Sequence, residues 1–321
     1  MKTSSKGFPV SILEQFVQSV VFRCLVLALA FVAPLAINAA DTRKTFATPE
    51  EAVSVLAAAA SAQDSNALRD IFGPATADIE NPDRVQAANE LTAFTAAFNL
   101  TNRIVRESDS KCVVEVGEHF WPFPIPVVKQ EGQWFFDTES GKDEILNRRI
   151  GENELATLEV VRAYVEAQRE YAAKDRDGKE VLKFAQKIIS SPGMKDGLYW
   201  PPELDGEISP LGPLAADAAA DGYGKNRESE RQPFHGYFFK ILTRQGKHSP
   251  GGKYNYVING DMIGGFALVA WPAEYGESGI MTFIVNQQGR VYQKDLGPRT
   301  AKTAGAMRSY DPDKTWAASP E

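Results

Sequence analysis

Residues 153–172 read NELATLEVVRAYVEAQREYA, a pattern typical of a long amphipathic helix. Glutamate and arginine side chains cover one face of this helix, as expected when the opposite face packs against a core. The apolar face is made by residues at helical spacing: Leu155, Leu158, Val161, Val165 and Ala172. We therefore expect a long helix that starts at residue 152 or 153 and opens a folding unit.

Upstream of this helix, the sequence predicts a domain of helices followed by strands. Thr48, Pro49 and Glu51 predict the start of a helix, because the threonine caps it and the glutamate completes a capping box. Two more helices are expected at 68–72 and 81–98, strands at 103–106, 112–116, 125–129 and 133–137, and a bridging helix at 142–150. The boundary near residue 150 gives domains 41–150 and 151–321.

Downstream of the long helix, the sequence predicts a second helix, a long loop and an antiparallel sheet. The helix is expected around 181–189, and the Pro/Gly-rich loop at 197–233 contains a short helix at 214–220. The strands are expected at 237–243, 254–259, 264–271, 279–286 and 290–294. Since helices precede strands in each half, the fold class is α+β. The first half combines helices with a curved antiparallel sheet, and the second combines a long helix with another sheet.

The first forty residues have the order of a secretory signal peptide. Lys2, Lys6 and Arg23 supply positive charge, and residues 24–33 form an uninterrupted apolar run. Small residues at 39–40 then offer a cleavage site before Asp41. An uncleaved anchor is the alternative, but a spanning helix needs about 20 apolar residues, more than this run supplies. We expect an exported, periplasmic protein with no membrane span after cleavage.

Composition argues against two kinds of partner. Removing residues 1–40 removes three basic residues and one acidic residue from totals of 35 and 42. The remaining 32 Lys and Arg against 41 Asp and Glu give a formal charge of −9. Nucleic-acid binding needs a positive footprint, and so does adhesion to anionic lipid. We therefore expect no nucleic-acid partner.

The motifs of common enzyme and cofactor sites do not occur in the sequence. The three histidines, His119, His235 and His248, lack metal-ligand spacing, although the last two could approach one another across a strand. Asp175 and Asp177 resemble the opening of a calcium loop, but Lys179 would place a positive charge inside it. A helix end with an Asp-Gly turn is the alternative for this segment. We expect no cofactor and no metal. Cys112 is expected to be a small buried residue.

Aromatic residues beside prolines and acids give the candidate ligand-binding set: Tyr199, Trp200, Trp271, Tyr275, Asp196 and Glu274. Prolines hold Tyr199 and Trp200 in a rigid loop, and exposed rigid rings suit a binding groove. In that case the rings should be partly exposed around one concavity. The alternative is that they fill the ends of the cores.

Several phrases together carry a family resemblance. In the second half they are AQREYA (167–172), DRDG (175–178), DGLYWP (196–201), SPLGPL (209–214), HGY (235–237), AWPAEYG (270–276) and YQKDLGP (292–298); in the first half they are WPFPIP (121–126) and FDT (136–138). With these phrases the chain resembles the bacterial family catalogued as domain of unknown function 2950. The resemblance covers nearly all of the chain beyond residue 40. It implies an exported bacterial protein and supplies no catalytic residues.

Two looser likenesses concern the fold of each half. TPEEA at 48–52 and GQWFF at 132–136 resemble segments of the cone-shaped nuclear-transport-factor-2 and SnoaL-like group. The second half is similar to the globular part of pseudopilins, without their hydrophobic stalk.

From these observations we expect a non-enzymatic binding or envelope-assembly accessory protein whose partner is an unknown envelope protein or glycan. The alternative is an envelope hydrolase that acts on glycan or peptide through carboxylates near Asp196 and Glu274.

Overall fold

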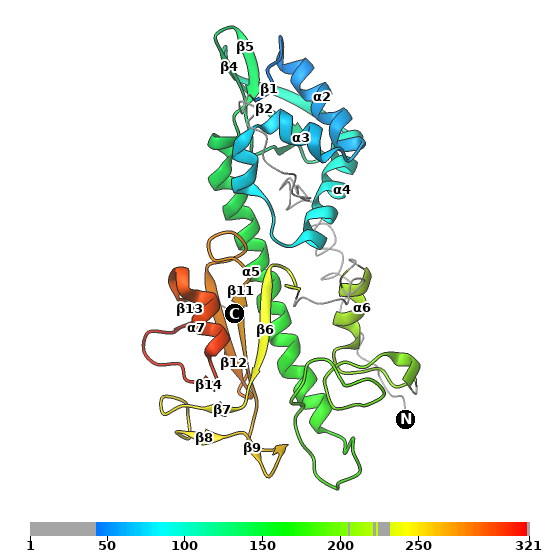
Figure 1. The fold of residues 1–321 in the computed structure, drawn as a ribbon, viewed down its shortest axis with the longest axis vertical. Helices are drawn as coiled ribbons and strands as arrows, with labels where there is room; N and C mark the ends of the chain where they lie inside the picture. The colour runs from blue at the N-terminus through cyan, green and yellow to red at the C-terminus, as the bar shows by residue number, and fades with distance from the viewer. Residues whose placement is uncertain (1–42, 205, 221–222, 224–231, 320–321) are drawn as a thin grey trace, which may run out of the picture. The chain divides into compact units, whose positions relative to one another are not determined.

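The computed structural model describes residues 43–319 except 205, 221–222 and 224–231. Its contacts divide the chain into two compact units, unit 1 up to Arg149 and unit 2 from Ile150 onward. Independent folding of the two units stays a prediction. The predicted signal segment lies outside the described residues. Both units combine helices with mainly antiparallel sheets, which confirms the α+β class (Figure 1).

Unit 1 begins with helices whose starts are set by local chemistry. α2 (Pro49–Ser61) starts as predicted: the Thr48 hydroxyl accepts a hydrogen bond from the Glu51 amide at 3.1 Å, and the Glu51 carboxylate accepts one from the Ala47 amide at 2.9 Å. Aspartate side chains cap the next two helices. These helices and the 3-10 helix between them are α3 (Ser65–Phe72), η1 (Pro74–Ile79) and α4 (Arg84–Leu100).

The sheet of unit 1 packs one face against these helices. Its strands pair in the order β1-β2-β4-β5, and β3 pairs with β2. In β2, Cys112, Val114 and Val116 are buried, whereas the residues between them are half-buried. The α2 and α3 helices contact β5, so the core lies between them and the sheet (Figure 1). The strands are β1 (Asn102–Ser108), β2 (Lys111–Val116), β3 (Trp121–Pro122), β4 (Val127–Gln130) and β5 (Gln133–Phe136).

The α5 helix (Thr138–Ala172) is continuous, so the prediction of separate helices at 142–150 and 153–172 is wrong. Gly151 lies inside it, and glycine weakens a helix by about 1 kcal/mol without removing a backbone donor. Side chains on either side of Gly151 are anchored. In unit 1, Arg149 donates to the Glu80 carbonyl at 2.9 Å, and in unit 2, Asn153 donates to the Ser278 carbonyl at 2.8 Å.

Unit 2 is built on an antiparallel sheet of order β15-β13-β12-β11-β6. Every residue of β11 is buried. The α7 helix contacts this strand, and Tyr164 of α5 donates to the Ala267 carbonyl at 3.2 Å. The elements are β6 (Tyr237–Leu242), β11 (Ala267–Pro272), β12 (Met281–Asn286), β13 (Tyr292–Asp295), η3 (Gly297–Arg299), α7 (Thr300–Ala306) and β15 (Ala317–Ala318).

Smaller elements complete unit 2. The α6 helix (Gly212–Ala220) confirms the short helix expected at 214–220. The strand expected at 254–259 is instead two short strands, and the strand predicted at 290–294 starts later. The remaining elements are η2 (Pro202–Leu204), β7 (Arg244–Gln245), β8 (Tyr254–Asn255), β9 (Val257–Ile258), β10 (Asp261–Met262) and β14 (Ser309–Tyr310).

Residues 181–189 are not helical, which corrects the prediction from their apolar spacing. Instead Phe184 forms a bridge with Met262, and the buried side-chain amide of Gln168 forms hydrogen bonds with both backbone groups of Ala185. Gln168 donates to the Ala185 carbonyl and accepts from the Ala185 amide, both at 2.8 Å. These tertiary hydrogen bonds replace those of a helix at this position.

Candidate functional site

Trp200 lies in the core of unit 2, where only 1% of its surface is exposed. Its indole N–H donates to the Glu207 carbonyl oxygen at 3.1 Å. Arg176 and Lys195 lie over its ring at 4.9 and 5.3 Å from the centroid. This burial agrees with the alternative that the ring fills the core: the loop turns it inward, where its N–H finds a backbone acceptor.

Ion pairs around Glu207 hold this loop. The Glu207 carboxylate accepts from Lys174 at 2.8 Å, from Lys195 at 2.5 Å and from Arg176 at 3.0 Å. These hydrogen bonds lower the pKa of Glu207 to about 2. Since three cations already surround it, we interpret Glu207 as a structural residue that fixes the loop containing Trp200.

Trp271 is also buried, with 4% of its surface exposed. It belongs to β11, where it pairs with Phe238 of β6, and the two rings lie 5.9 Å apart. This burial agrees with the alternative that the ring fills the core, and Lys240 of β6 lies over the ring at 5.9 Å from its centroid.

The other four predicted residues belong to different segments of unit 2 and have separate contacts. Asp196 accepts from the Ser191 amide at 2.7 Å and from Lys187 at 2.5 Å. Tyr275 donates to Asp295 at 3.2 Å, and Glu274 is exposed. Tyr199 is half-buried and forms a bridge with Ile189. Among the described residues, the hydrogen-bond partners of the Asp196 carboxylate belong to the 187–191 segment, whereas the Glu274 backbone amide donates to the Ser278 hydroxyl at 3.0 Å.

The remaining polar candidates are held by local contacts. His248 lies 3.1 Å from Asp311, whereas the His235 ring packs against Phe234 with centroids 4.3 Å apart. Asp175 accepts from the amides of Asp177 and Gly178, as in an Asp-Gly turn. Within the described ranges, no three His, Cys, Asp or Glu side chains cluster as metal ligands would.

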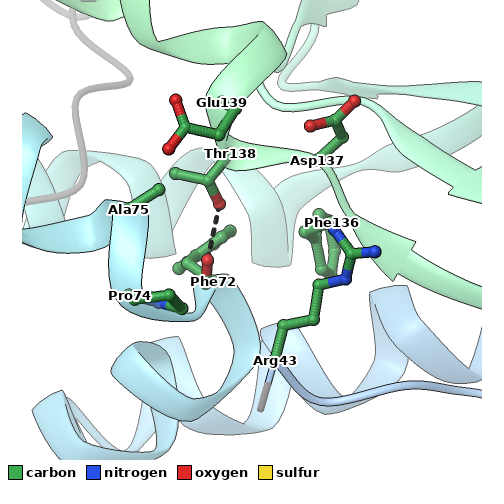
Figure 2. Close-up of a pocket in the computed structure, with 8 residues that line it drawn as sticks. All are labelled: Arg43, Phe72, Pro74, Ala75, Phe136, Asp137, Thr138 and Glu139. Carbon is green, nitrogen blue, oxygen red and sulfur yellow. Dashed lines mark hydrogen bonds between the residues drawn. The ribbon is translucent and has the colours of Figure 1, made fainter. Parts of the chain in front are cut away.

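A pocket of about 390 Å³ lies in unit 1, between the end of α3 and the start of α5 (Figure 2). Its volume is at the lower end of the range of about 300–1,000 Å³ found for small-molecule sites. Three separate stretches of chain line it: Arg43, Phe72, Pro74, Ala75, Phe136, Asp137, Thr138 and Glu139.

The glycine that ends α3 allows the N-terminal segment around Arg43 to pass close to this helix. Gly73 has φ +71°, a conformation that glycine adopts without strain. A Cβ at Gly73 would lie 3.0 Å from the Cβ of Arg43, so the glycine also makes room for the N-terminal segment. That segment continues into an antiparallel bridge between Phe46 and Trp134 of β5. Arg43 is thereby placed at the pocket.

Two aromatic rings form the apolar floor of the pocket. Phe72 and Phe136 are 2% and 1% exposed, and their ring centroids lie 5.3 Å apart in an edge-to-face arrangement. Phe123 packs against both of them. Because these rings belong to the core of unit 1, the floor is rigid before any ligand arrives.

The start of α5 supplies hydroxyl and carboxylate groups. Thr138 is buried and donates its hydroxyl to the Phe72 carbonyl at 2.8 Å. Asp137 accepts from the Ser140 hydroxyl at 2.6 Å and from the Ser140 amide at 3.3 Å. Glu139 follows in the first turn and is exposed. Both carboxylates are favoured by the positive end of the helix dipole.

Arg43 supplies the opposite charge. Its guanidinium lies 3.4 Å from the centroid of the Phe135 ring, and it donates to the Gln130 side chain at 3.0 Å. A guanidinium has five N–H donors, so these two contacts orient the group and leave others for a ligand. Figure 2 shows Arg43 reaching the pocket from the strand side, whereas Glu139 lies toward the η1 side.

Sequence reasoning missed this pocket, although one signal was present. Phe136, Asp137 and Thr138 form one of the phrases that carry the family resemblance. Arg43 and Phe72 have no recognisable motif, and only the folded chain brings them to that phrase.

A buried polar cluster lies elsewhere in unit 1. Glu90 of α4 is 5% exposed, and both of its carboxylate oxygens accept from the Asn81 side-chain amide at 3.3 Å. Burial raises the pKa of Glu90 to about 8, against the lowering effect of Arg149. Since Arg149 also donates to the carbonyls of Ile79 and Glu80, we interpret this cluster as an anchor between η1 and α5.

A family model described as "Protein of unknown function (DUF2950)" matches residues 43–318. The chain belongs to the DUF2950 family. The match includes both units and every residue that lines the pocket. Neither the curated proteins nor the solved structures contain a match to this DUF2950 protein, so the two looser fold likenesses stay predictions. No helix in the described ranges is long and apolar enough to cross a membrane.

Proposed function

We propose that this DUF2950 protein is an exported, non-enzymatic binding protein of the bacterial envelope and that the pocket of unit 1 is its ligand site. The observation that carries the proposal is a cavity with a rigid aromatic floor and charges of both signs at its rim. Ligand sites commonly combine an apolar lining with a few placed polar groups. The export part rests on the order of basic, apolar and small residues in the first forty positions.

The walls of the pocket are tied together, which favours binding. Three side chains of α5 contact the α3–η1 wall. Thr138 donates to the Phe72 carbonyl, Lys142 lies 2.6 Å from Asp78, and Arg149 donates to backbone carbonyls at the end of η1. A preformed site loses less entropy when a ligand binds.

The polar lining favours binding over catalysis. A nucleophile needs a general base within hydrogen-bond reach. Here the Thr138 hydroxyl donates to a backbone carbonyl, and Asp137 caps α5 through Ser140. In the hydrolase alternative, Asp196 is already paired with Lys187 and with the Ser191 amide, which favours a structural role for this carboxylate.

The proposal is tested by small-molecule capture. The purified protein is dialysed against the low-molecular-mass fraction of a periplasmic extract, and retained compounds are measured by mass spectrometry. Ala75→Trp places a large ring at the pocket wall and should abolish retention, whereas Ala77→Trp alters an exposed position on the same 3-10 helix and should not. Equal retention by both variants would refute the pocket as the ligand site.

A further inference from the structure

The rim of the unit 1 pocket carries opposite charges that come from different segments of the chain. Arg43 brings a positive charge from the N-terminal segment, and Asp137 and Glu139 bring negative charges from the start of α5. Figure 2 shows the Arg43 guanidinium and the Glu139 carboxylate on different sides of the aromatic floor. A ligand that lies in this pocket is therefore close to the positive charge of Arg43 and to the negative charge of Glu139.

This arrangement discriminates between ligands by charge. An anion drawn to Arg43 would be repelled by the two carboxylates, and a cation drawn to the carboxylates would be repelled by Arg43. An uncharged ligand would gain no ion pair with the exposed Arg43 and Glu139 side chains. A ligand with an ammonium at one end and a carboxylate at the other matches both charges.

The apolar lining selects the body of the ligand. Pro74 is exposed and Ala75 is half-buried, so these two residues supply accessible apolar surface above the buried Phe72 and Phe136 rings. The volume of about 390 Å³ limits the ligand to a compact molecule.

We propose that the pocket binds a small apolar zwitterion: a free amino acid with an apolar side chain, or a short apolar peptide. Both share the same chemistry: an ammonium directed to Glu139, a carboxylate directed to Arg43, and an apolar side chain against Pro74 and Ala75 (Figure 2). This inference rests on the proposed function, because it names the ligand class of the same site.

The test uses three analogues with one body. Isothermal titration calorimetry measures the affinity of the purified protein for phenylalanine, for N-acetylphenylalanine, which is an anion, and for phenylalanine amide, which is a cation. A dipeptide of two phenylalanines distinguishes the peptide from the free amino acid. We expect a zwitterion to bind about two- to fivefold more tightly than either singly charged analogue, the range for one exposed ion pair.

Charge-neutral variants assign each end of the ligand. Arg43→Gln should remove the preference over phenylalanine amide, and Glu139→Gln should reduce the preference over N-acetylphenylalanine. Lys44→Gln and Glu118→Gln remove the same charges from exposed positions of unit 1 outside the pocket lining, and both should keep the wild-type preferences. Thermal melts of all four variants establish that they are folded.

Two outcomes overturn the inference. In one, a singly charged analogue binds the wild-type protein as tightly as the zwitterions, or the preferences survive in Arg43→Gln and Glu139→Gln. In the other, none of these probes binds, whereas Ala75→Trp still abolishes capture from the extract; the ligand class is then wrong and the proposed function stands. Capture that Ala75→Trp leaves unchanged would instead refute the proposed function itself.

Discussion

Replacing Trp200 by alanine should destabilise unit 2 strongly. The ring is 1% exposed, packs within the core cluster of the unit and donates its N–H to the Glu207 carbonyl. Truncation of a buried tryptophan to alanine costs about 3–5 kcal/mol of unfolding free energy. In a unit of this size each kcal/mol lowers Tm by about 2–4 °C, so the expected shift is about 6–20 °C.

The measurement is a thermal melt followed by circular dichroism, with urea unfolding to give the free energy. Trp316→Ala is the matched control, because Trp316 belongs to the same unit and is only half-buried. The control should lose less stability than Trp200→Ala. If the Tm of Trp200→Ala lay within about 2 °C of the wild-type Tm, the ring would contribute little to the stability of the core, and the reasoning from its burial would be refuted.

Three further predictions concern pH, processing and domain structure. Burial raises the pKa of Glu90 from 4.5 to about 8, so the folded state holds a proton that the unfolded chain releases. The free energy of unfolding should therefore fall as pH rises from about 4.5 to about 8, and Glu90→Gln should flatten this dependence in urea melts. Mass spectrometry of the periplasmic fraction should find a mature chain that starts near Asp41; a chain that retains Met1 would contradict export by cleavage. Of the fragments 41–149 and 150–321, at least one should be soluble and melt cooperatively, and failure of both would show a single folding unit.

Local chemistry explains which elements could be predicted from the sequence. The start of α2 was predictable because Thr48 and Glu51 satisfy the first backbone amides from within the same segment. The strands of unit 1 were placed within a few residues for a similar reason, since alternating burial leaves a local pattern.

Tertiary contacts explain the errors. Residues 181–189 have helical spacing, but the side chain of Gln168, 17 residues earlier, binds the Ala185 amide and carbonyl in place of helix partners. For the loop around Trp200, the sequence left two interpretations open, an exposed binding groove and a ring that fills the core, because prolines indicate a rigid loop without giving its direction. Its direction is set by Arg176 and Lys195, which the sequence alone does not place beside the ring.

The pocket could not be predicted from the sequence, because tertiary contacts bring its lining residues together. Its lining comes from the N-terminal segment, the α3–η1 turn and the β5–α5 junction, and no period or spacing relates Arg43 to Phe72 or Glu139. Only the close approach at Gly73 and the bridge from Phe46 to β5 bring them together.

The location of the ligand site is tested most directly by NMR chemical-shift mapping on the isotope-labelled protein, titrated with the low-molecular-mass periplasmic fraction. The proposed site predicts that the amide signals of Ala75, Thr138 and Glu139, which line the pocket, shift as ligand is added. Shifts confined to unit 2, at residues such as Asp196 and Glu274, with the pocket signals unchanged, would contradict it.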